Sequence, residues 1–343
     1  MTERQTLSRP LFEVLAPGMM TTIQDLGRFG YRRYGVPVSG AMDSFALRVA
    51  NMLAGNGEES ACLEMTFQGA TLRALEPCYV ALTGADMQPL LNDQRIDMWT
   101  GFPMKTGDVL SLQDARKGCR SYMAVSGGFH VPFVLRSRST YVRGNFGGHE
   151  GRALKRGDVL RGEQTPPGGK VRYLGQEDLP EYLEGRIVRV FVGPQDDYFT
   201  EKGMKTFLSS EYEVTSESDR MGFRLRGPPI EHSREPEIIS DGVTVGSIQV
   251  PGSGMPIVAM RDAGTTGGYP KIANVTCVDL DKMAQLKPGD RIRFERVELA
   301  EAHILLQRHM QQLEDLRKKI RERHLSPEFP DAETLMRLQG AII

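Results

Sequence analysis

Short apolar runs separated by glycine-containing turns fill most of this chain and restrict what it can fold into. Runs of this length, rich in β-branched and aromatic residues, predict strands. The regular alternation of strand and helix patterns that a parallel sheet needs is missing. The sequence therefore predicts a mainly β protein, built as barrels or sandwiches. The predicted strands are 78–83, 121–125, 187–192, 211–216, 223–226, 246–250, 256–260 and 291–297.

The length and the repeats indicate a duplicated architecture. A chain of 343 residues usually forms more than one domain, and the Gly/Pro-rich and acidic stretches at 162–169 and 176–184 are typical of a linker. A Lys-x-Gly-Asp turn before a strand pattern begins at Lys105, Lys155 and Lys287.

A second repeat is more specific. Asp25 and Arg28 precede the pair Gly30-Tyr31. In the same way, Asp219 and Arg220 precede the pair Gly222-Phe223. If both halves fold alike, Arg28 and Arg220 occupy equivalent positions.

Two segments have the spacing of helices. Residues 44–53 follow a capping residue, Asp43 or Ser44, and Gly55 comes after their end. Near the C-terminus, leucine or isoleucine recurs every seven residues from Leu299 to Ile320, which predicts an amphipathic helix of six or seven turns. Docking on its own barrel is one interpretation of this helix, and the narrow stripe favours self-association or partner binding through 299–323.

Charge and cysteine usage narrow the class of protein. The 43 basic and 44 acidic residues balance, so nothing indicates binding to nucleic acid or to a membrane surface. The first ten residues lack the apolar core of a signal peptide, and no apolar run reaches the roughly 20 residues of a membrane span. The four cysteines are widely spaced, without metal-ligand spacing, which predicts reduced thiols in a cytoplasmic protein and no metal site.

The loop 261–271 is the first candidate for a site. It follows an apolar run, and its glycines remove Cβ atoms where a ligand or another backbone comes close. Thr265 and Thr266 add hydroxyl groups, and Asp262 and Lys271 add ionisable groups of both signs, as a small polar substrate requires. The alternative is a tight turn whose glycines serve only the backbone.

Two further glycine-rich loops carry polar groups. Gln24, Asp25 and Arg28 lie in the first, where functional groups are often displayed. The second, 137–152, could bind an anion such as phosphate through Arg138, Arg143 and Arg152. The alternative for the first loop is a solvated turn with a structural Asp–Arg pair. The alternative for the second is a basic surface loop, and the sequence contains no named nucleotide-binding loop.

Six motifs together resemble one family. They are 21–28 (TTIQDLGR), 35–43 (GVPVSGAMD), 82–86 (LTGAD), 137–140 (SRST), 218–222 (SDRMG) and 267–271 (GGYPK). They occur in the right order and are similar to the biotin-dependent carboxyltransferase-like family, also called allophanate hydrolase subunit 2-like. Arg136 departs from the family pattern, which usually has Gly at this position.

The resemblance implies two tandem cyclophilin-like β-barrel domains, at 1–175 and 185–297, followed by a helical tail at 298–343. It also implies the role of the C-subunit in an ATP-dependent 5-oxoprolinase, which opens 5-oxoproline to glutamate together with the B- and A-subunits. ATP would then be shared with these partners. The chain has no biotin attachment motif, so any biotin would be carried by another protein.

Within that reaction, a positive clamp would stabilise the charge that develops on oxygen. Lys271, Arg220 and Arg28 are the candidates for the clamp. Asp262, or secondarily Asp25, is the candidate for orienting or deprotonating the substrate nitrogen. The remaining residues expected to bind substrate are Gln24, Thr265, Thr266, Gly267, Gly268 and Tyr269.

Two other functions stay open at this point. The first is a biotin-dependent carboxyltransferase subunit that acts on urea or a related amide. The second is a regulatory binding protein that antagonises a kinase inhibitor, which would need a partner surface but no intact pocket.

Overall fold

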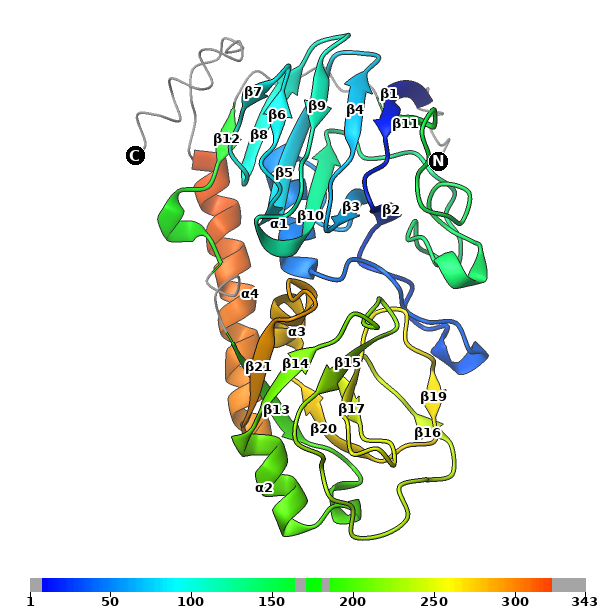
Figure 1. Ribbon diagram of the computed structural model, residues 1–343. Helices are drawn as coiled ribbons and strands as arrows, with labels where there is room; N and C mark the ends of the chain where they lie inside the picture. Colours follow the sequence, from blue (N-terminus) through cyan, green and yellow to red (C-terminus); the bar gives the residue numbers. More distant parts are fainter. Residues whose placement is uncertain (1–7, 164–170, 181–185, 323–343) are drawn as a thin grey trace, which may run out of the picture. The chain divides into compact units, whose positions relative to one another are not determined.

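The computed structural model describes residues 8–163, 171–180 and 186–322 and divides the chain into two compact units (Figure 1). The first unit comprises residues 1–27, 43–180 and 313–343, and the second comprises 28–42 and 181–312. The division into 1–175, 185–297 and a tail from 298 remains a proposal. Residues 323–343 of that tail, and much of the expected linker, lie outside the described residues.

Two six-stranded sheets make up most of the first unit. One has the order β11-β1-β4-β9-β6-β7, and the other has the order β12-β8-β5-β10-β3-β2. Pairing within both sheets is antiparallel. The strands are β1 (Ser8–Ala16), β2 (Met20–Gln24), β3 (Cys62–Thr66), β4 (Thr71–Ala74), β5 (Cys78–Asp86), β6 (Leu90–Leu91), β7 (Gln94–Arg95), β8 (Thr100–Met104), β9 (Val109–Ser111), β10 (Lys117–Val125), β11 (Val159–Glu163) and β12 (Arg172–Tyr173).

The helix expected at 44–53 is α1 (Ser44–Ala54). The carboxylate of Asp43 accepts a hydrogen bond from the backbone N–H of Ala46 at 2.8 Å, which caps the first turn. Gly55 ends the helix with a left-handed φ of 80°, a conformation that glycine adopts without strain. The capping signals in the sequence were therefore sufficient to place this helix.

The second unit is a closed barrel with the order β13-β20-β17-β18-β15-β14-β21, in which the parallel pair β13–β21 completes the circle. A separate two-stranded sheet pairs β16 with β19. The strands are β13 (Ile187–Val192), β14 (Glu211–Val214), β15 (Gly222–Arg226), β16 (Asp241–Gly242), β17 (Ser247–Gln249), β18 (Ile257–Ala259), β19 (Thr266–Gly267), β20 (Lys271–Val275) and β21 (Arg291–Arg296). The mainly β class and the C-terminal helix are thus confirmed.

The segment 28–42 belongs to the barrel unit although it precedes the first unit's helix in the chain. The side chain of Met42 is fully buried in the barrel core. The backbone N–H of Ser39 donates to the carbonyl oxygen of Arg261 at 2.9 Å, so the segment is also hydrogen-bonded to the loop that begins there. The sequence motif 35–43 therefore joins the second unit through both apolar burial and backbone pairing.

Three helices are associated with the second unit, and two of them were not expected. They are α2 (Glu201–Ser209), α3 (Cys277–Ala284) and the first part of α4 (Leu299–Glu322). The last turns of α4 belong to the first unit and bury Leu313, Leu316 and Ile320. Part of the apolar stripe is therefore buried in the chain's own fold. Self-association through 299–323 stays a prediction. Among the described residues, no helix combines the length and apolar character needed to cross a membrane.

The three Lys-x-Gly-Asp sequences form the same turn. In each, the Asp carboxylate accepts a hydrogen bond from the backbone N–H of the Lys, at 2.7 Å for Lys105, 2.7 Å for Lys155 and 2.9 Å for Lys287. The glycine of each turn has a φ close to 90°. The recurrence seen in the sequence therefore reflects one local structure, used before β9, β11 and β21.

Candidate functional site

The predicted site residues divide between the two units, so each unit is described by itself. Gln24, Asp25 and the three arginines of 137–152 lie in the first unit. Arg28 and the residues from Arg220 to Lys271 lie in the second.

Asp25 anchors the Ser-Arg-Ser-Thr loop of the first unit. Its carboxylate accepts hydrogen bonds from the hydroxyl groups of Ser137 at 2.7 Å and Ser139 at 2.5 Å. It also accepts from the backbone N–H groups of Gly27 and Arg138, at 2.7 and 2.5 Å. Three of these four donors belong to the loop and fix it to the buried carboxylate, which is a structural role for a residue that the sequence placed among the catalytic candidates.

Gln24 is completely buried beside this loop. Its amide nitrogen donates to the hydroxyl of Thr22 at 3.0 Å and to the carbonyl oxygen of Thr140 at 3.2 Å. Among the described residues, its amide oxygen has no hydrogen-bond partner. Gln24 thus ties β2 to Thr140, the residue that follows Ser-Arg-Ser.

The turn before this loop has an unusual backbone. Val134 and Ser137 exchange backbone hydrogen bonds, and the two residues between them, Leu135 and Arg136, have φ values of 53° and 61°. Two successive left-handed residues characterise a type I′ turn, which prefers Asn-Gly. The glycine that the family usually has at position 136 would fit this backbone, whereas Arg136 strains it.

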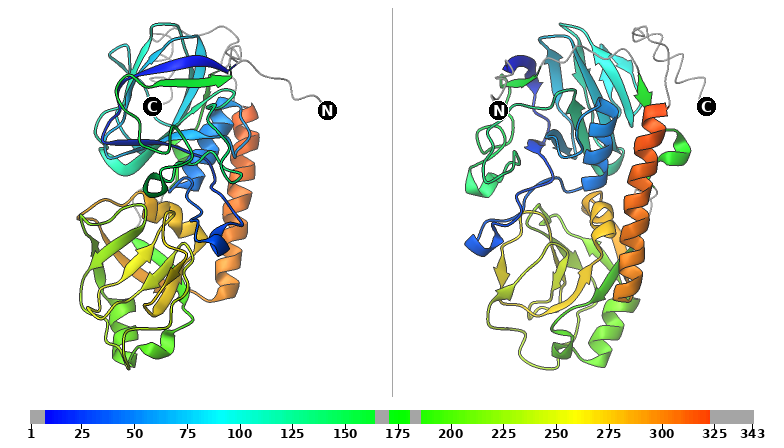
Figure 2. Two further views of the ribbon diagram at one scale, coloured as in Figure 1. Left: turned by 90° about the vertical axis from the view of Figure 1, so that its right-hand side faces the viewer. Right: turned by 180° about the vertical axis from the view of Figure 1, so that it is seen from behind.

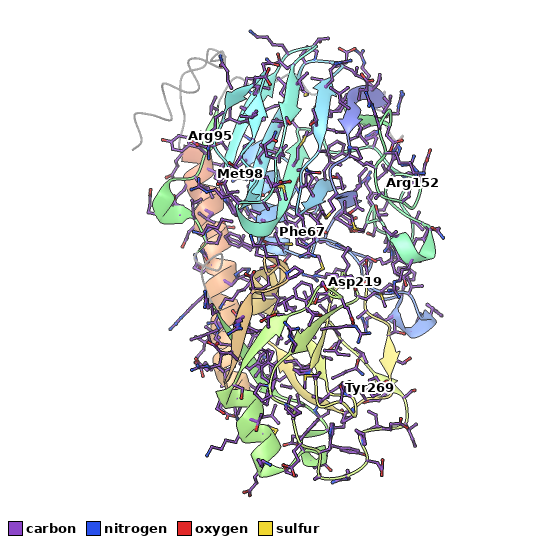
Figure 3. All side chains as sticks on the ribbon, in the orientation of Figure 1. Phe67, Arg95, Met98, Arg152, Asp219 and Tyr269 are labelled. Carbon is purple, nitrogen blue, oxygen red and sulfur yellow. The ribbon has the colours of Figure 1, made fainter. Side chains whose placement is uncertain are left out.

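The three arginines expected to bind phosphate have different surroundings. Arg138 stacks on the ring of Phe133 at 4.1 Å, and burial lowers its pKa. Arg143 is exposed on the short helix Val142–Gly144. Arg152 forms ion pairs with Asp158 at 2.7 Å and Glu150 at 2.6 Å, and it is labelled in Figure 3. Because two carboxylates already neutralise Arg152, anion binding by this loop stays a prediction that depends mainly on Arg138 and Arg143.

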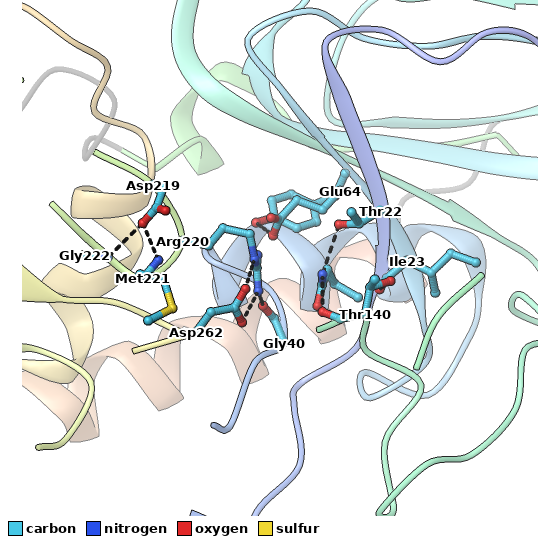
Figure 4. Close-up of polar contacts among 12 residues, drawn as sticks. Thr22, Ile23, Gly40, Glu64, Thr140, Asp219, Arg220, Met221, Gly222 and Asp262 are labelled. Carbon is cyan, nitrogen blue, oxygen red and sulfur yellow. Dashed lines mark hydrogen bonds and ion pairs between the residues drawn. The ribbon is translucent and has the colours of Figure 1, made fainter. Parts of the chain in front are cut away.

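In the second unit, Arg220 and Asp262 form a buried, two-pronged ion pair. The Nε and Nη2 atoms of Arg220 lie 2.9 and 3.2 Å from the Oδ2 and Oδ1 atoms of Asp262, and the side chains are each 8% exposed (Figure 4). Nη2 of Arg220 also donates to the carbonyl oxygen of Gly40 at 2.7 Å. The structure thus brings together two predicted catalytic residues and links them to the segment 28–42, in which Arg28 is also fully buried.

Lys271 forms a different ion pair. Its Nζ atom lies 2.8 Å from Oδ2 of Asp241, and its side chain is 3% exposed whereas that of Asp241 is 55% exposed. Gln195 links the pair, since its amide nitrogen donates to Asp241 at 3.3 Å and its amide oxygen accepts from the backbone N–H of Lys271 at 3.1 Å. The hydrogen bond from Lys271 lowers the pKa of Asp241. The sequence missed Asp241 and Gln195, because neither lies in a motif or near Lys271 in the chain.

An ammonium group can donate three hydrogen bonds, and that of Lys271 makes one within the described chain. Its two other donors have no partner among the described residues. The second unit therefore presents two fixed cations, Arg220 and Lys271, each held by a carboxylate.

The loop between Asp262 and Lys271 is held mainly by its backbone. Thr265 accepts from the N–H of Val243 at 3.0 Å, and Gly268 accepts from that of Ile238 at 2.9 Å. A Cβ atom at Gly267 would lie 2.4 Å from Nε2 of Gln249, so the end of the Gln249 side chain packs closely over this glycine. The hydroxyl-bearing Thr266 and the ring of Tyr269, labelled in Figure 3, are exposed.

No cluster of three or more His, Cys, Asp or Glu side chains suited to a metal ion occurs in the described part of the chain. Metal binding therefore has no candidate centre among those residues. Arg220 and Lys271 are cations of the kind that stabilises negative charge on oxygen, and this role for them stays a prediction.

Comparisons with known proteins identify the family of the chain. A family model described as the carboxyltransferase domain, subdomains A and B, matches residues 34–296. The C-subunit of the Escherichia coli 5-oxoprolinase is 40% identical over 296 residues, which are 85% of this chain and 93% of that protein. The protein of the same name from Haemophilus influenzae is 38% identical over 92% of this chain and 100% of its own length.

Urea-metabolising proteins are also similar. The urea amidolyase of Lachancea kluyveri is 34% identical over 82% of this chain, which spans 17% of that protein. The crystal structure of Kluyveromyces lactis urea amidolyase matches with a TM-score of 0.83 at 31% identity, over 95% of this chain and 20% of the other.

Proposed function

Since this chain belongs to the family of carboxyltransferase domains with subdomains A and B, we propose that it acts as the C-subunit of an ATP-dependent 5-oxoprolinase. In this role it opens the lactam ring of 5-oxoproline to glutamate in a cytoplasmic complex with the B- and A-subunits, and ATP is shared with them. The observation that carries the proposal is the two-way coverage of both 5-oxoprolinase relatives, 93% and 100% of their lengths. The urea amidolyase relatives match at lower identity and over a small fraction of their length.

The chemistry explains why fixed cations are useful here. A lactam nitrogen is a poor leaving group, so the ring must be activated by phosphorylating the carbonyl oxygen or by carboxylating the nitrogen. Both routes develop negative charge on oxygen, and we assign its stabilisation to the fixed cations Arg220 and Lys271. Asp262 holds Arg220 by two hydrogen bonds, and we assign it an orienting role in preference to the role of base.

The substrate itself carries a carboxylate and a carbonyl oxygen. The two remaining donors of Lys271 suit either group, with Thr266 and Tyr269 exposed on the preceding loop. Arg28 and Gln24 stay proposals for substrate binding. These proposals rest on the resemblance to the family more than on the local geometry.

The experiment measures ADP and glutamate production by the complex with the A- and B-subunits. Arg220→Lys keeps the charge but loses the two-pronged geometry, and we expect kcat to fall about 100-fold or more. Arg224→Lys is the matched control, because Arg224 lies nearby in the chain, on β15, and its side chain is 55% exposed. Equal activity of the two variants would contradict the assigned role of Arg220.

Carboxylation of urea or a related amide by a biotin carried on another protein is the second candidate, favoured by the urea amidolyase relatives. A complex that consumes ATP with urea and bicarbonate, and not with 5-oxoproline, would move this candidate ahead.

A further inference from the structure

A cavity of about 650 Å³ lies in the first unit, and none of the residues assigned to the reaction lines it. It is lined by the end of α1, the loop that follows it, and the last turns of α4. These elements lie side by side in the view from behind (Figure 2). Its volume is within the range of small-molecule sites, which is about 300 to 1,000 Å³.

The lining of the cavity has an excess of positive charge. Four arginines contribute to it, and the carboxylates that face it are those of Glu58 and Glu59. The lining therefore carries a net charge of +2, four positive charges less two negative ones. The excess of positive charge favours an anion in the cavity.

Glu58 is already engaged by two of the four arginines. Its carboxylate pairs with Arg48 at 2.7 Å and with Arg317 of α4, and its side chain is 14% exposed. Partial burial alone would raise the pKa of Glu58, but the hydrogen bonds from Arg317 and Arg48 outweigh this effect and lower it. Arg317 also pairs with Glu314 at 2.8 Å. This neutral group of four charges fixes α4 against the loop after α1 and forms one wall of the cavity.

Arg172 and Arg321 supply the cations that remain. Nη1 of Arg172 donates to the carbonyl oxygen of Leu53 at 3.3 Å, and a Cβ atom at position 55 would lie 2.5 Å from it, so Gly55 leaves the space that this guanidinium occupies. Arg321 is exposed and makes no ion pair or side-chain hydrogen bond within the described chain. The guanidinium of Arg172 is thus held in place, and that of Arg321 is available to a ligand.

We propose that this cavity binds a small organic dianion, either a phosphate monoester or a dicarboxylate. Arg172 and Arg321 bind its charged groups, because a guanidinium pairs two of its N–H groups with a phosphate or carboxylate. Met52 and Ile320, both buried, form an apolar part of the lining that fits the carbon body of such a molecule. No aromatic ring lines the cavity, so the stacking that would hold a nucleobase is absent among the described residues.

The test is isothermal titration of the full chain with glycerol phosphate and with succinate. Arg321→Gln removes one charge-assisted interaction and weakens binding about 10- to 100-fold. Lys318→Gln is the matched control, since Lys318 is exposed on the same helix turn and does not line the cavity. It changes the affinity less than about twofold, because its effect is limited to a screened long-range field.

Binding of glycerol phosphate alone identifies the ligand as a phosphate monoester, and binding of succinate alone identifies a dicarboxylate. Either result supports the site when Arg321→Gln weakens the binding of that probe. The proposal is overturned if neither probe binds at about 10 mM. It is also overturned if Arg321→Gln and Lys318→Gln bind with the same affinity.

Discussion

Replacing Arg136 with glycine should stabilise the protein, although it removes a side chain and a charge. Arg136 has a φ of 61° in the turn between Val134 and Ser137, and its side chain is exposed. A left-handed conformation costs a residue with a Cβ atom about 1–2 kcal/mol. Glycine avoids this penalty, but its extra freedom in the unfolded chain costs about 0.5–1 kcal/mol. The difference is a gain of about 0.5–1 kcal/mol in the free energy of unfolding for Arg136→Gly.

The same replacement at Arg156 serves as the control. Arg156 is exposed in the turn that begins at Lys155, and it is not among the residues with positive φ. Only the entropic term applies there, so Arg156→Gly should lower the free energy of unfolding by about 0.5–1 kcal/mol. Urea unfolding of both variants, monitored by circular dichroism, measures whether the free energy of unfolding rises for Arg136→Gly and falls for Arg156→Gly. If both variants are destabilised alike, the strain assigned to the turn is refuted.

Three further predictions concern charged groups. Asp241→Ala leaves the ammonium of Lys271 buried without its carboxylate and should lower the free energy of unfolding by about 3 kcal/mol. Lys271→Met leaves an exposed carboxylate that water can hydrate, and should change the free energy of unfolding by less than about 1 kcal/mol. Equal losses for the two variants in urea unfolding would contradict the expected difference between them. Asp25→Ala removes an acceptor of four donors and should lower the free energy of unfolding by about 3 kcal/mol, whereas a purely catalytic Asp25 predicts unchanged stability and lost activity. The hydrogen bond from Arg152 lowers the pKa of Asp158 from 3.8 to about 2, so its contribution of about 1–2 kcal/mol is present above pH 3.8 and is lost as the pH falls through 2. Asp158→Asn should therefore flatten the acid limb of a stability–pH curve, and an unchanged limb would contradict the assignment.

The strands and the first helix followed from short-range information. Strand patterns and glycine turns recur at a spacing that only a mainly β fold accommodates, and Asp43 and Gly55 mark both ends of α1. The Lys-x-Gly-Asp turns are also local, because the Asp carboxylate reaches back three residues. The helices α2 and α3 were missed because each is short. Thr200 caps α2 by accepting a hydrogen bond from the backbone N–H of Gly203, whereas Thr276 precedes α3 without such a bond.

The site was predictable only in part. Arg220 and Asp262 were singled out separately, and their pairing depends on adjacent strands of the barrel, β15 and β18, which the sequence does not order. Asp241 and Gln195 lie 30 and 76 residues from Lys271 and have no motif of their own. Long-range pairing of this kind is set by topology, so a single sequence shows the charged residues but not their partners.

The measurement that tests the central claim most directly is the release of ADP and glutamate by the purified complex of this chain with the A- and B-subunits. We expect both products in equal amounts, only with 5-oxoproline and only when this chain is present. Lys271→Met should abolish them while the complex still assembles on size-exclusion chromatography. If a fully assembled complex hydrolyses no ATP in response to 5-oxoproline, the assignment as a 5-oxoprolinase subunit is wrong.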